Sequence, residues 1–395
     1  MSLHSIQPPS TPSGFALFEL GFRPFFLLAG WLGVLLVGIW GAVYANLISL
    51  NTYYGMIGWH SHEMLFGYTP AVIGGFLLTA VRNWTGVATI RGPLLAGLAL
   101  VWLGGRLLPL IPAAPHWLVA AVDLAFLPCL IISLVPPLLH GKAKNWMFVV
   151  ILGVMAAANT LVHLQLLGVG TGGHSGAYLM SHLILLIISV MGGRVIPFFT
   201  EVGVRPVQIQ VRRRDWVDRT AIGLVVALAA AQTLAPYSPL TPILALLAAI
   251  AHGIRLAGWY HPLIWNYPLL WILHLAYLWL VIGLALIPLA SLGIVSPFVA
   301  LHAFTTGCIG GITLGMMARV ALGHSGRPLA VHPAITVAFV AIMLCALVRV
   351  VGPILLPGNP QLISFSALLW VVAFGLFSLI YTPILIRPRV DGRPG

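Results

Sequence analysis

The stretch WHSHEMLFGY, residues 59–68, places two histidines and a glutamate at the start of a long apolar run. Neutral imidazole is a ligand for haem iron and for copper. Residues i and i+2 of a helix point about 200° apart. We therefore predict that His60 and His62 serve different cofactors on opposite sides of one helix.

Glu63 follows His60 by three residues, which puts the two side chains on nearly the same face of a helix. Its carboxylate can hold the second N–H of a ligating imidazole or carry a proton to a buried site. Glu63 is therefore the candidate catalytic residue. The alternative is an interfacial carboxylate that pairs with a nearby base.

Further histidines lie within other apolar runs, where an ionisable side chain is costly and normally marks function. The candidate metal ligands are His60, His62, His163, His182, His274 and His302. The histidines early in the second, sixth and tenth runs are also candidates for binding haem: His60, His62, His182 and His302. The alternative for any single one is a hydrogen-bonded packing residue.

The composition excludes a water-soluble globule. The chain has 395 residues, 60% of them hydrophobic and 7% charged, whereas soluble domains carry about 25% charged residues. The three cysteines form no C-x-x-C pair, which argues against a disulfide framework, a thiolate zinc site and covalently attached haem. The net charge of +12 is scattered between apolar runs, so we expect a lipid bilayer, and no nucleic acid, as partner.

Apolar windows of about 20 residues, enough to cross the hydrocarbon core of a bilayer, recur along the whole chain. They cover approximately residues 24–47, 59–81, 93–111, 117–138, 146–168, 176–200, 219–235, 240–259, 264–288, 297–321, 333–356 and 364–386. The sequence therefore predicts an all-α polytopic membrane protein with about twelve transmembrane helices. We divide it into a cytoplasmic N-terminal segment (1–23), a single transmembrane domain (24–386) and a cytoplasmic basic tail (387–395).

The basic residues follow the positive-inside rule, by which Lys and Arg collect on the cytoplasmic side. The loops after even-numbered spans hold Arg82, Arg91, Lys142, Lys144, Arg205, Arg212, Arg213, Arg214, Arg219, Arg255 and Arg327. The loops after odd-numbered spans hold essentially Arg106, and the tail holds Arg387, Arg389 and Arg393. The sequence therefore predicts that both termini face the cytoplasm.

This orientation gives each histidine a depth, at about 1.5 Å of rise per residue. Near the outer face, within roughly two turns of one level, we place His60, His62, His163, His182 and His302. His274 is expected deeper, near the middle of the membrane. An inner-face group is interpreted as loop and interface polarity: His252, His261, His324 and His332.

The second, sixth and tenth spans share a pattern, which suggests three pseudo-repeats of four helices. Each has an early histidine, then a Gly-Gly pair, then an arginine toward the inner end: Arg82, Arg194 and Arg319. Arg194 and Arg319 could bind haem propionates. Alternatively they extend to the cytoplasmic interface or pair with Glu201.

The motifs ELGFRPFF (19–26), WHSHEMLFGY and GGFLLTAVRNWTG (74–86) resemble the NnrS family of bacterial membrane proteins. The resemblance continues through HLILLIISVMGGRVIPFFT (182–200) and ALGHSGRPL (321–329). It implies a bacterial inner-membrane protein of about twelve spans that contains haem and copper. It also implies a role in nitric oxide metabolism and nitrosative-stress defence. We expect one or two b-type haems, nitric oxide as ligand and a separate, unidentified electron donor.

The layout is also similar to the catalytic subunits of haem-copper oxidases and nitric oxide reductases, so the activity expected is that of a nitric oxide reductase-like oxidoreductase. It departs from them because the His-x-His is on the second span, not the tenth, and because the His-His pair of their seventh helix is missing. One alternative is a membrane transporter that uses buried His and Glu for binding or proton relay. Another is a haem- or copper-handling protein. An optical spectrum separates a coloured haem protein from a transporter.

Overall fold

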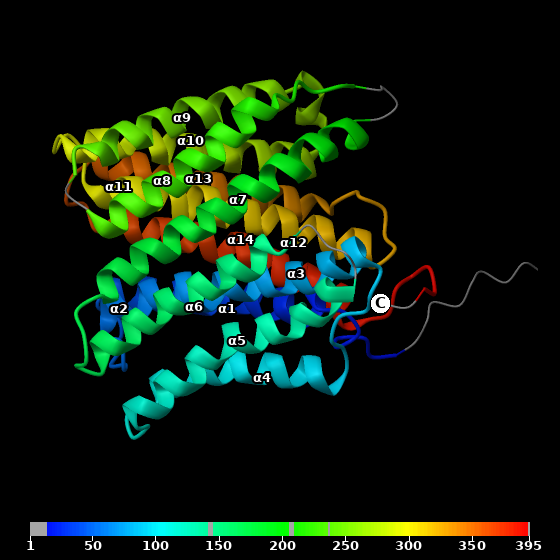
Figure 1. Cartoon of the computed structure of the whole chain (residues 1–395), viewed down its shortest axis with the longest axis horizontal. Helices are drawn as coiled ribbons and strands as arrows, with labels where there is room; N and C mark the ends of the chain where they lie inside the picture. The colour runs from blue at the N-terminus through cyan, green and yellow to red at the C-terminus, as the bar shows by residue number, and fades with distance from the viewer. Residues whose placement is uncertain (1–13, 141–144, 205–208, 236–237, 394–395) are drawn as a thin grey trace, which may run out of the picture.

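The computed structural model describes residues 14–140, 145–204, 209–235 and 238–393. Within these ranges it contains twelve helices long and apolar enough to cross a membrane, and no strands (Figure 1). The prediction of an all-α polytopic membrane protein is therefore confirmed. The predicted inner-face residues Lys142, Lys144 and Arg205 lie outside the described residues, as do 1–13 and 394–395 of the two predicted terminal segments.

The spans agree with the apolar windows to within a few residues. Most spans are single α-helices: α1 (Phe22–Tyr44), α5 (His116–His140), α6 (Met147–Leu166), α7 (Gly173–Gly203), α8 (Asp215–Leu234), α9 (Leu240–Trp259), α10 (Pro268–Ser291), α13 (Pro333–Leu355) and α14 (Gln361–Ile386). The third span is α4 (Pro93–Leu107) followed by the 3-10 turn η2 (Leu108–Leu110). The second span is composed of α2 (Met56–His62), η1 (Glu63–Tyr68) and α3 (Thr69–Thr85), and the tenth of α11 (Pro297–His302), η4 (Ala303–Gly310) and α12 (Gly311–His324). A short 3-10 helix, η3 (Pro262–Asn266), precedes α10.

Local sequence explains where several helices begin. Proline occupies the first helical position of α4, α10, α11 and α13, where its missing N–H costs no hydrogen bond. The seventh span begins at Asp215, earlier than the window at 219, because Asp215 and Asp218 stabilise the positive end of the helix dipole in its first turn.

The helices lie side by side along the long axis of the molecule (Figure 1). The backbone N–H of Ala16 donates to the carbonyl of Ile386 at 2.8 Å, so the start of the described chain lies against the end of the last span. Both ends of the described chain therefore lie at one end of the bundle, which we call the predicted inner end. Residues 51–55 lie at the opposite, predicted outer end, and which side of the membrane each faces stays a prediction.

Four of the five spans that carry the candidate ligands are the most buried ones, and the exception is the fifth span of the chain, which carries His163 and is 39% buried. The second span is 89% buried, the ninth and tenth are 72% buried and the sixth is 61% buried, whereas the other spans range from 28% to 50%. Around them α1 packs against α14 and α14 against α13, which closes the bundle. Of the candidate histidines on these spans, His62, His182 and His274 are buried in protein, whereas His60 and His302 are half-buried.

Two spans change from α to π geometry directly after a histidine. The π-helical segment η1 follows His62, and η4 follows His302. Such segments are rare and occur most often at functional sites. The sixth span, which belongs to the second predicted repeat, lacks this feature, because α7 is an uninterrupted α-helix from Gly173 to Gly203. The pattern shared by the second and tenth spans thus extends to local structure, and the sixth span does not share it.

We expect Gly307→Ala to destabilise the protein, because a Cβ at Gly307 would overlap the ring of Trp279 on α10. Overpacking of this kind costs about 1–3 kcal/mol. The control is Gly153→Ala, where a Cβ meets nothing within 4 Å and should stabilise the helix slightly. Thermal unfolding in detergent measures both, and an equal melting temperature for the two variants would contradict the close packing of η4 against α10.

Candidate functional site

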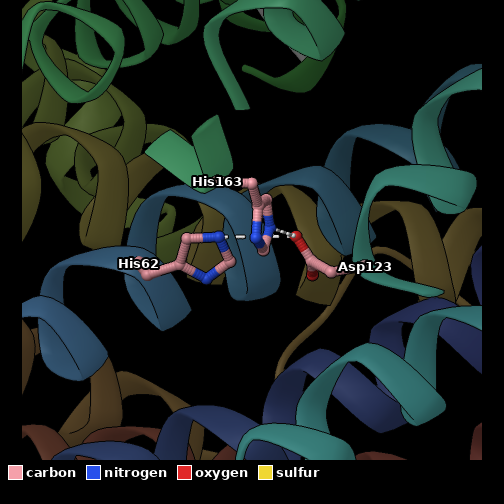
Figure 2. Close-up of side chains that lie close together, drawn as sticks. All are labelled: His62, Asp123 and His163. Atoms are coloured by element: carbon pink, nitrogen blue, oxygen red, sulfur yellow. Dashed lines mark hydrogen bonds and ion pairs between the residues drawn. The ribbon is translucent and has the colours of Figure 1, made fainter. Parts of the chain in front are cut away.

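A cluster of buried polar side chains lies between the second, fourth and fifth spans (Figure 2). His62 ends α2, Asp123 lies on α5 and His163 lies near the end of α6. The Oδ2 atom of Asp123 is 2.9 Å from Nε2 of His163 and 3.4 Å from Nε2 of His62. All three residues are at most 5% exposed. One carboxylate oxygen thus faces two imidazole nitrogens in the protein interior.

Asn159 completes the contacts of this cluster from one helical turn before His163. Its Nδ2 donates to Oδ2 of Asp123 at 2.8 Å, and its Oδ1 lies 3.1 Å from Nε2 of His62. The His62 ring is also stacked between aromatic rings, with centroids 4.0 Å from Tyr54 and 4.9 Å from Phe66. These contacts fix the orientation of the His62 imidazole.

The third span adds one cation, Arg106. Its Nη2 donates to Oδ1 of Asp123, and its Nε lies 3.4 Å from Oε2 of Glu63. The three charged side chains are at most 5% exposed. Charges in such surroundings persist only when they are paired, so Arg106 holds both carboxylates in place. We call His62, Glu63, Arg106, Asp123, Asn159 and His163 the polar cluster.

Tyr53, in the loop at the predicted outer end, connects this cluster to the surface. Its hydroxyl lies 3.3 Å from Nδ1 of His163, and its ring packs edge-on against His116. Burial raises the pKa of Tyr53 to about 12, so the hydroxyl stays protonated at neutral pH. A line of hydrogen-bonding groups therefore leads from a half-buried loop residue to Asp123.

A cavity of about 530 Å³ lies on the other side of the second span. His60 and His302 both line it, together with Trp40, Arg349 and Trp370. The Nδ1–H of His302 donates to the carbonyl of Phe298 at 2.6 Å, which leaves Nε2 as the acceptor nitrogen. The His60 ring stacks on Trp40 with centroids 4.4 Å apart. The cavity therefore presents two imidazoles, one guanidinium and aromatic walls.

The prediction that His60 and His62 point in opposite directions is confirmed, because His60 lines the cavity and His62 belongs to the polar cluster. The prediction that Glu63 shares the face of His60 is wrong, because Glu63 lies with Arg106 and 3.8 Å from Nδ1 of His62. The backbone becomes π-helical at Glu63, and a cation from another span attracts the carboxylate. The alternative prediction was an interfacial carboxylate paired with a base. Glu63 does pair with a base, Arg106, but it is 1% exposed and therefore not interfacial.

The structure does not bring the other two candidate ligands into either site. His182 donates its Nδ1–H to the carbonyl of Tyr178, and its Nε2 approaches Gln232 of α8 without reaching hydrogen-bond geometry. His274 lies in the second turn of α10 beside the end of α9, so it is nearer the predicted inner end than the predicted middle level. Its Nδ1 is 3.0 Å from the carbonyl of Leu270, and its Nε2 is 3.4 Å from that of Trp259 at the end of α9.

The candidate propionate partners lie away from the cavity. Arg194 donates to Oδ1 of Asn145 at 2.9 Å, and Arg319 lies over the ring of Phe199 at 3.8 Å. The alternative pairing with Glu201 is wrong, because Glu201 pairs with Arg213 of the following loop. The arginine on the cavity wall is Arg349, which the repeat pattern did not single out.

His252 is not interface polarity, as its place in the inner-face group suggested. It is fully buried, and its Nδ1 lies 2.6 Å from the hydroxyl of Tyr277, within hydrogen-bond distance. That hydroxyl accepts from Arg255 at 2.7 Å, and Arg255 also pairs with Asp218 at 2.6 Å. These residues tie α8, α9 and α10 together. By contrast, the rings of His261 and His332 accept backbone N–H groups at helix starts, as interface residues do.

At the polar cluster, sequence reasoning missed Arg106, Asp123 and Asn159 and the adjoining Tyr53, although the first three carried a signal. Asp123 is a single carboxylate within a long apolar run, and Asn159 precedes His163 by one helical turn. Arg106 was noticed only as the exception to the charge rule, and that exception is explained by its burial. Tyr53, in a loop, carried no signal of this kind.

The fold and the two sites define a polytopic membrane protein with buried histidines on both faces of its second span. The chain belongs to the NnrS family, whose sequence profile, described as NnrS protein, matches residues 16–389. A comparison with curated proteins found no match.

We expect Arg106→Met to destabilise the protein strongly, because it leaves Asp123 and Glu63 as buried carboxylates without a cation. Breaking a buried pair in this way costs about 3–5 kcal/mol. Arg194→Met is the matched control, since that side chain is exposed and hydrogen-bonds only to Oδ1 of Asn145 and Sδ of Met147 among the described residues, and surface changes stay within about 0.5 kcal/mol. Equal unfolding temperatures in detergent would show that Arg106 does not hold the cluster together.

Proposed function

We propose that this protein binds haem in the cavity lined by His60 and His302, uses copper as a second metal and acts on nitric oxide in nitrosative-stress defence. The observation that carries the proposal is the pair of sites on the two faces of the second span: a histidine-lined cavity on one and a histidine–carboxylate cluster on the other. Membership of the NnrS family supports it.

The residues of the cavity fit a haem. Neutral imidazoles are its usual ligands, and a ligating histidine normally donates its other ring N–H to a carbonyl. His302 does this to Phe298. The Nδ1 atom of His60 is buried and has no hydrogen-bond partner among the described residues. Arg349 could pair with a propionate, and Trp40 and Trp370 supply flat apolar walls. The volume of about 530 Å³ is within the range of ligand pockets.

A bound haem would supply the redox-active iron to which nitric oxide binds. The chain's own residues would position that iron, exclude water and supply protons. Nitric oxide is neutral and dissolves in lipid, so it can reach the cavity laterally and needs no polar channel. Electrons must come from a separate donor. We place the protein in the bacterial inner membrane with both termini in the cytoplasm, as its basic residues and family suggest.

Glu63 remains our candidate for delivering protons, now from the polar cluster. It begins the π-helical segment of the span that His60 shares, and Arg106 links it to Asp123. Tyr53 and His163 place this cluster beside the predicted outer end. This arrangement favours proton entry from the outer side.

The optical spectrum of the purified protein tests haem binding. We expect a Soret band that shifts when nitric oxide is added. His60→Ala or His302→Ala should remove most of it. His261→Ala and His332→Ala are the controls, because these rings accept N–H groups at helix starts. A colourless wild-type protein would favour a transporter, and a coloured one that does not consume nitric oxide with a reductant would favour haem handling.

We expect Glu63→Gln to keep the Soret band and to slow nitric oxide consumption at least tenfold. The amide is nearly isosteric with the carboxyl but cannot deliver a proton, and general acid–base groups typically contribute a factor of about 10²–10⁴. Glu201→Gln is the control, since that carboxylate pairs with Arg213 in a loop. A nitric oxide electrode measures both variants, and an undiminished rate in Glu63→Gln would leave this residue a purely structural role.

A further inference from the structure

We infer that His62, Asp123 and His163 form the binding site of one first-row transition-metal ion, separate from the cavity of His60 and His302 (Figure 2). The inference deepens the proposed function, because it gives the second metal a defined set of ligands. It is carried by contacts within the polar cluster that do not depend on haem or on nitric oxide.

The geometry of the three ligand atoms is close to that of a metal centre. In a tetrahedral site with bonds of about 2.1 Å, neighbouring ligand atoms lie about 3.4 Å apart. Oδ2 of Asp123 lies 3.4 Å from Nε2 of His62 and 2.9 Å from Nε2 of His163. All three ligand atoms lie within 4.8 Å of one another. Small side-chain movements would therefore bring them around one ion.

The surroundings orient each of these residues as a ligand. Metal-binding histidines and carboxylates usually hold hydrogen bonds through their remaining atoms. The Nδ1 of His163 faces the hydroxyl of Tyr53 at 3.3 Å, which leaves Nε2 directed at Asp123. Oδ1 of Asp123 is held by Arg106, and Oδ2, which accepts from Nδ2 of Asn159, faces both imidazoles. Tyr54 and Phe66 fix the ring of His62 by stacking.

The charges of the polar cluster do not balance. Two carboxylates, Glu63 and Asp123, face one guanidinium, that of Arg106, so with neutral imidazoles the cluster carries one uncompensated negative charge. Burying such a charge is costly, and a bound cation offsets it: a monovalent ion such as Cu⁺ brings the net charge to zero, and a divalent ion brings it to +1. The second buried network of this chain is different, because Asp218 and Arg255 balance each other. The uncompensated negative charge therefore distinguishes the polar cluster as a candidate site for a cation.

The ligand set selects the class of metal. Two imidazoles and one carboxylate suit copper, zinc and iron, and affinity among divalent ions is highest for Cu²⁺. Mg²⁺ and Ca²⁺ prefer sites made of oxygen ligands. The Oδ1 of Asn159 lies 3.1 Å from Nε2 of His62 and could supply a further oxygen ligand. Cu²⁺ is thus the appropriate probe.

The test is metal binding by the purified full-length protein after treatment with a chelator. Cu²⁺ is added through a competing buffer, bound copper per chain is measured by elemental analysis, and haem is measured separately from the Soret band. We expect one copper ion per chain, with an electron paramagnetic resonance spectrum that shows coupling to two imidazole nitrogens. His163→Ala and Asp123→Asn should lose this ion and keep haem. His60→Ala should lose haem and keep the ion.

Two milder variants keep the test decisive if a ligand variant fails to fold. Tyr53→Phe removes only the hydrogen bond to His163, and loss of such a partner weakens metal binding about 10- to 100-fold. His116→Ala changes a neighbouring histidine outside the ligand set and should leave affinity unchanged.

The inference is overturned if the wild-type protein keeps its Soret band but binds no copper, in which case a proton supplies the missing charge. It is also overturned if His60→Ala, and not His163→Ala, loses the copper. A protein that binds copper in this way but lacks a Soret band would refute the haem proposal and leave the metal site standing.

Discussion

The placement of Arg106 between two buried carboxylates is the constraint on which the site depends. In a chain with 7% charged residues, a charge inside the bundle has no water to stabilise it. Arg106 comes from the third span, Asp123 from the fourth and Glu63 from the second, so their contacts fix three spans relative to one another. Gly67 makes this approach feasible, because a Cβ there would overlap the guanidinium.

The positions of the membrane-spanning helices could be predicted from the sequence because the interactions that form them are local. Every backbone polar group in the bilayer must bond within its own helix, so an apolar run of about 20 residues has one stable conformation. The opposed directions of His60 and His62 followed from the same local geometry. Both predictions depended on residues adjacent in the chain, and both were right.

The sequence could not predict how each helix is rotated about its own axis. Counting residues gives a histidine a depth, but the face it occupies depends on packing between helices that are distant in sequence. His182 and His302 were predicted at one level, yet His302 faces the cavity and His182 faces α8. His252 was misjudged for the same reason, since its partners Tyr277 and Arg255 are contributed by tertiary packing. Glu63 was misplaced because a rare π-helical segment changes the rotation at that residue.

The two sites share one helix, and this imposes a coupling between them. His60 and His62 are separated by a single residue on α2, so a rotation that improved one ring's approach to its partners would withdraw the other. The helix is held from both sides, by stacking of His60 on Trp40 and by the contact of His62 with Asn159. The π-helical segment begins immediately afterwards, and its wider turn lets the rest of the span pack independently of the histidine pair. The position of both rings is therefore set by their neighbours on opposite sides of α2.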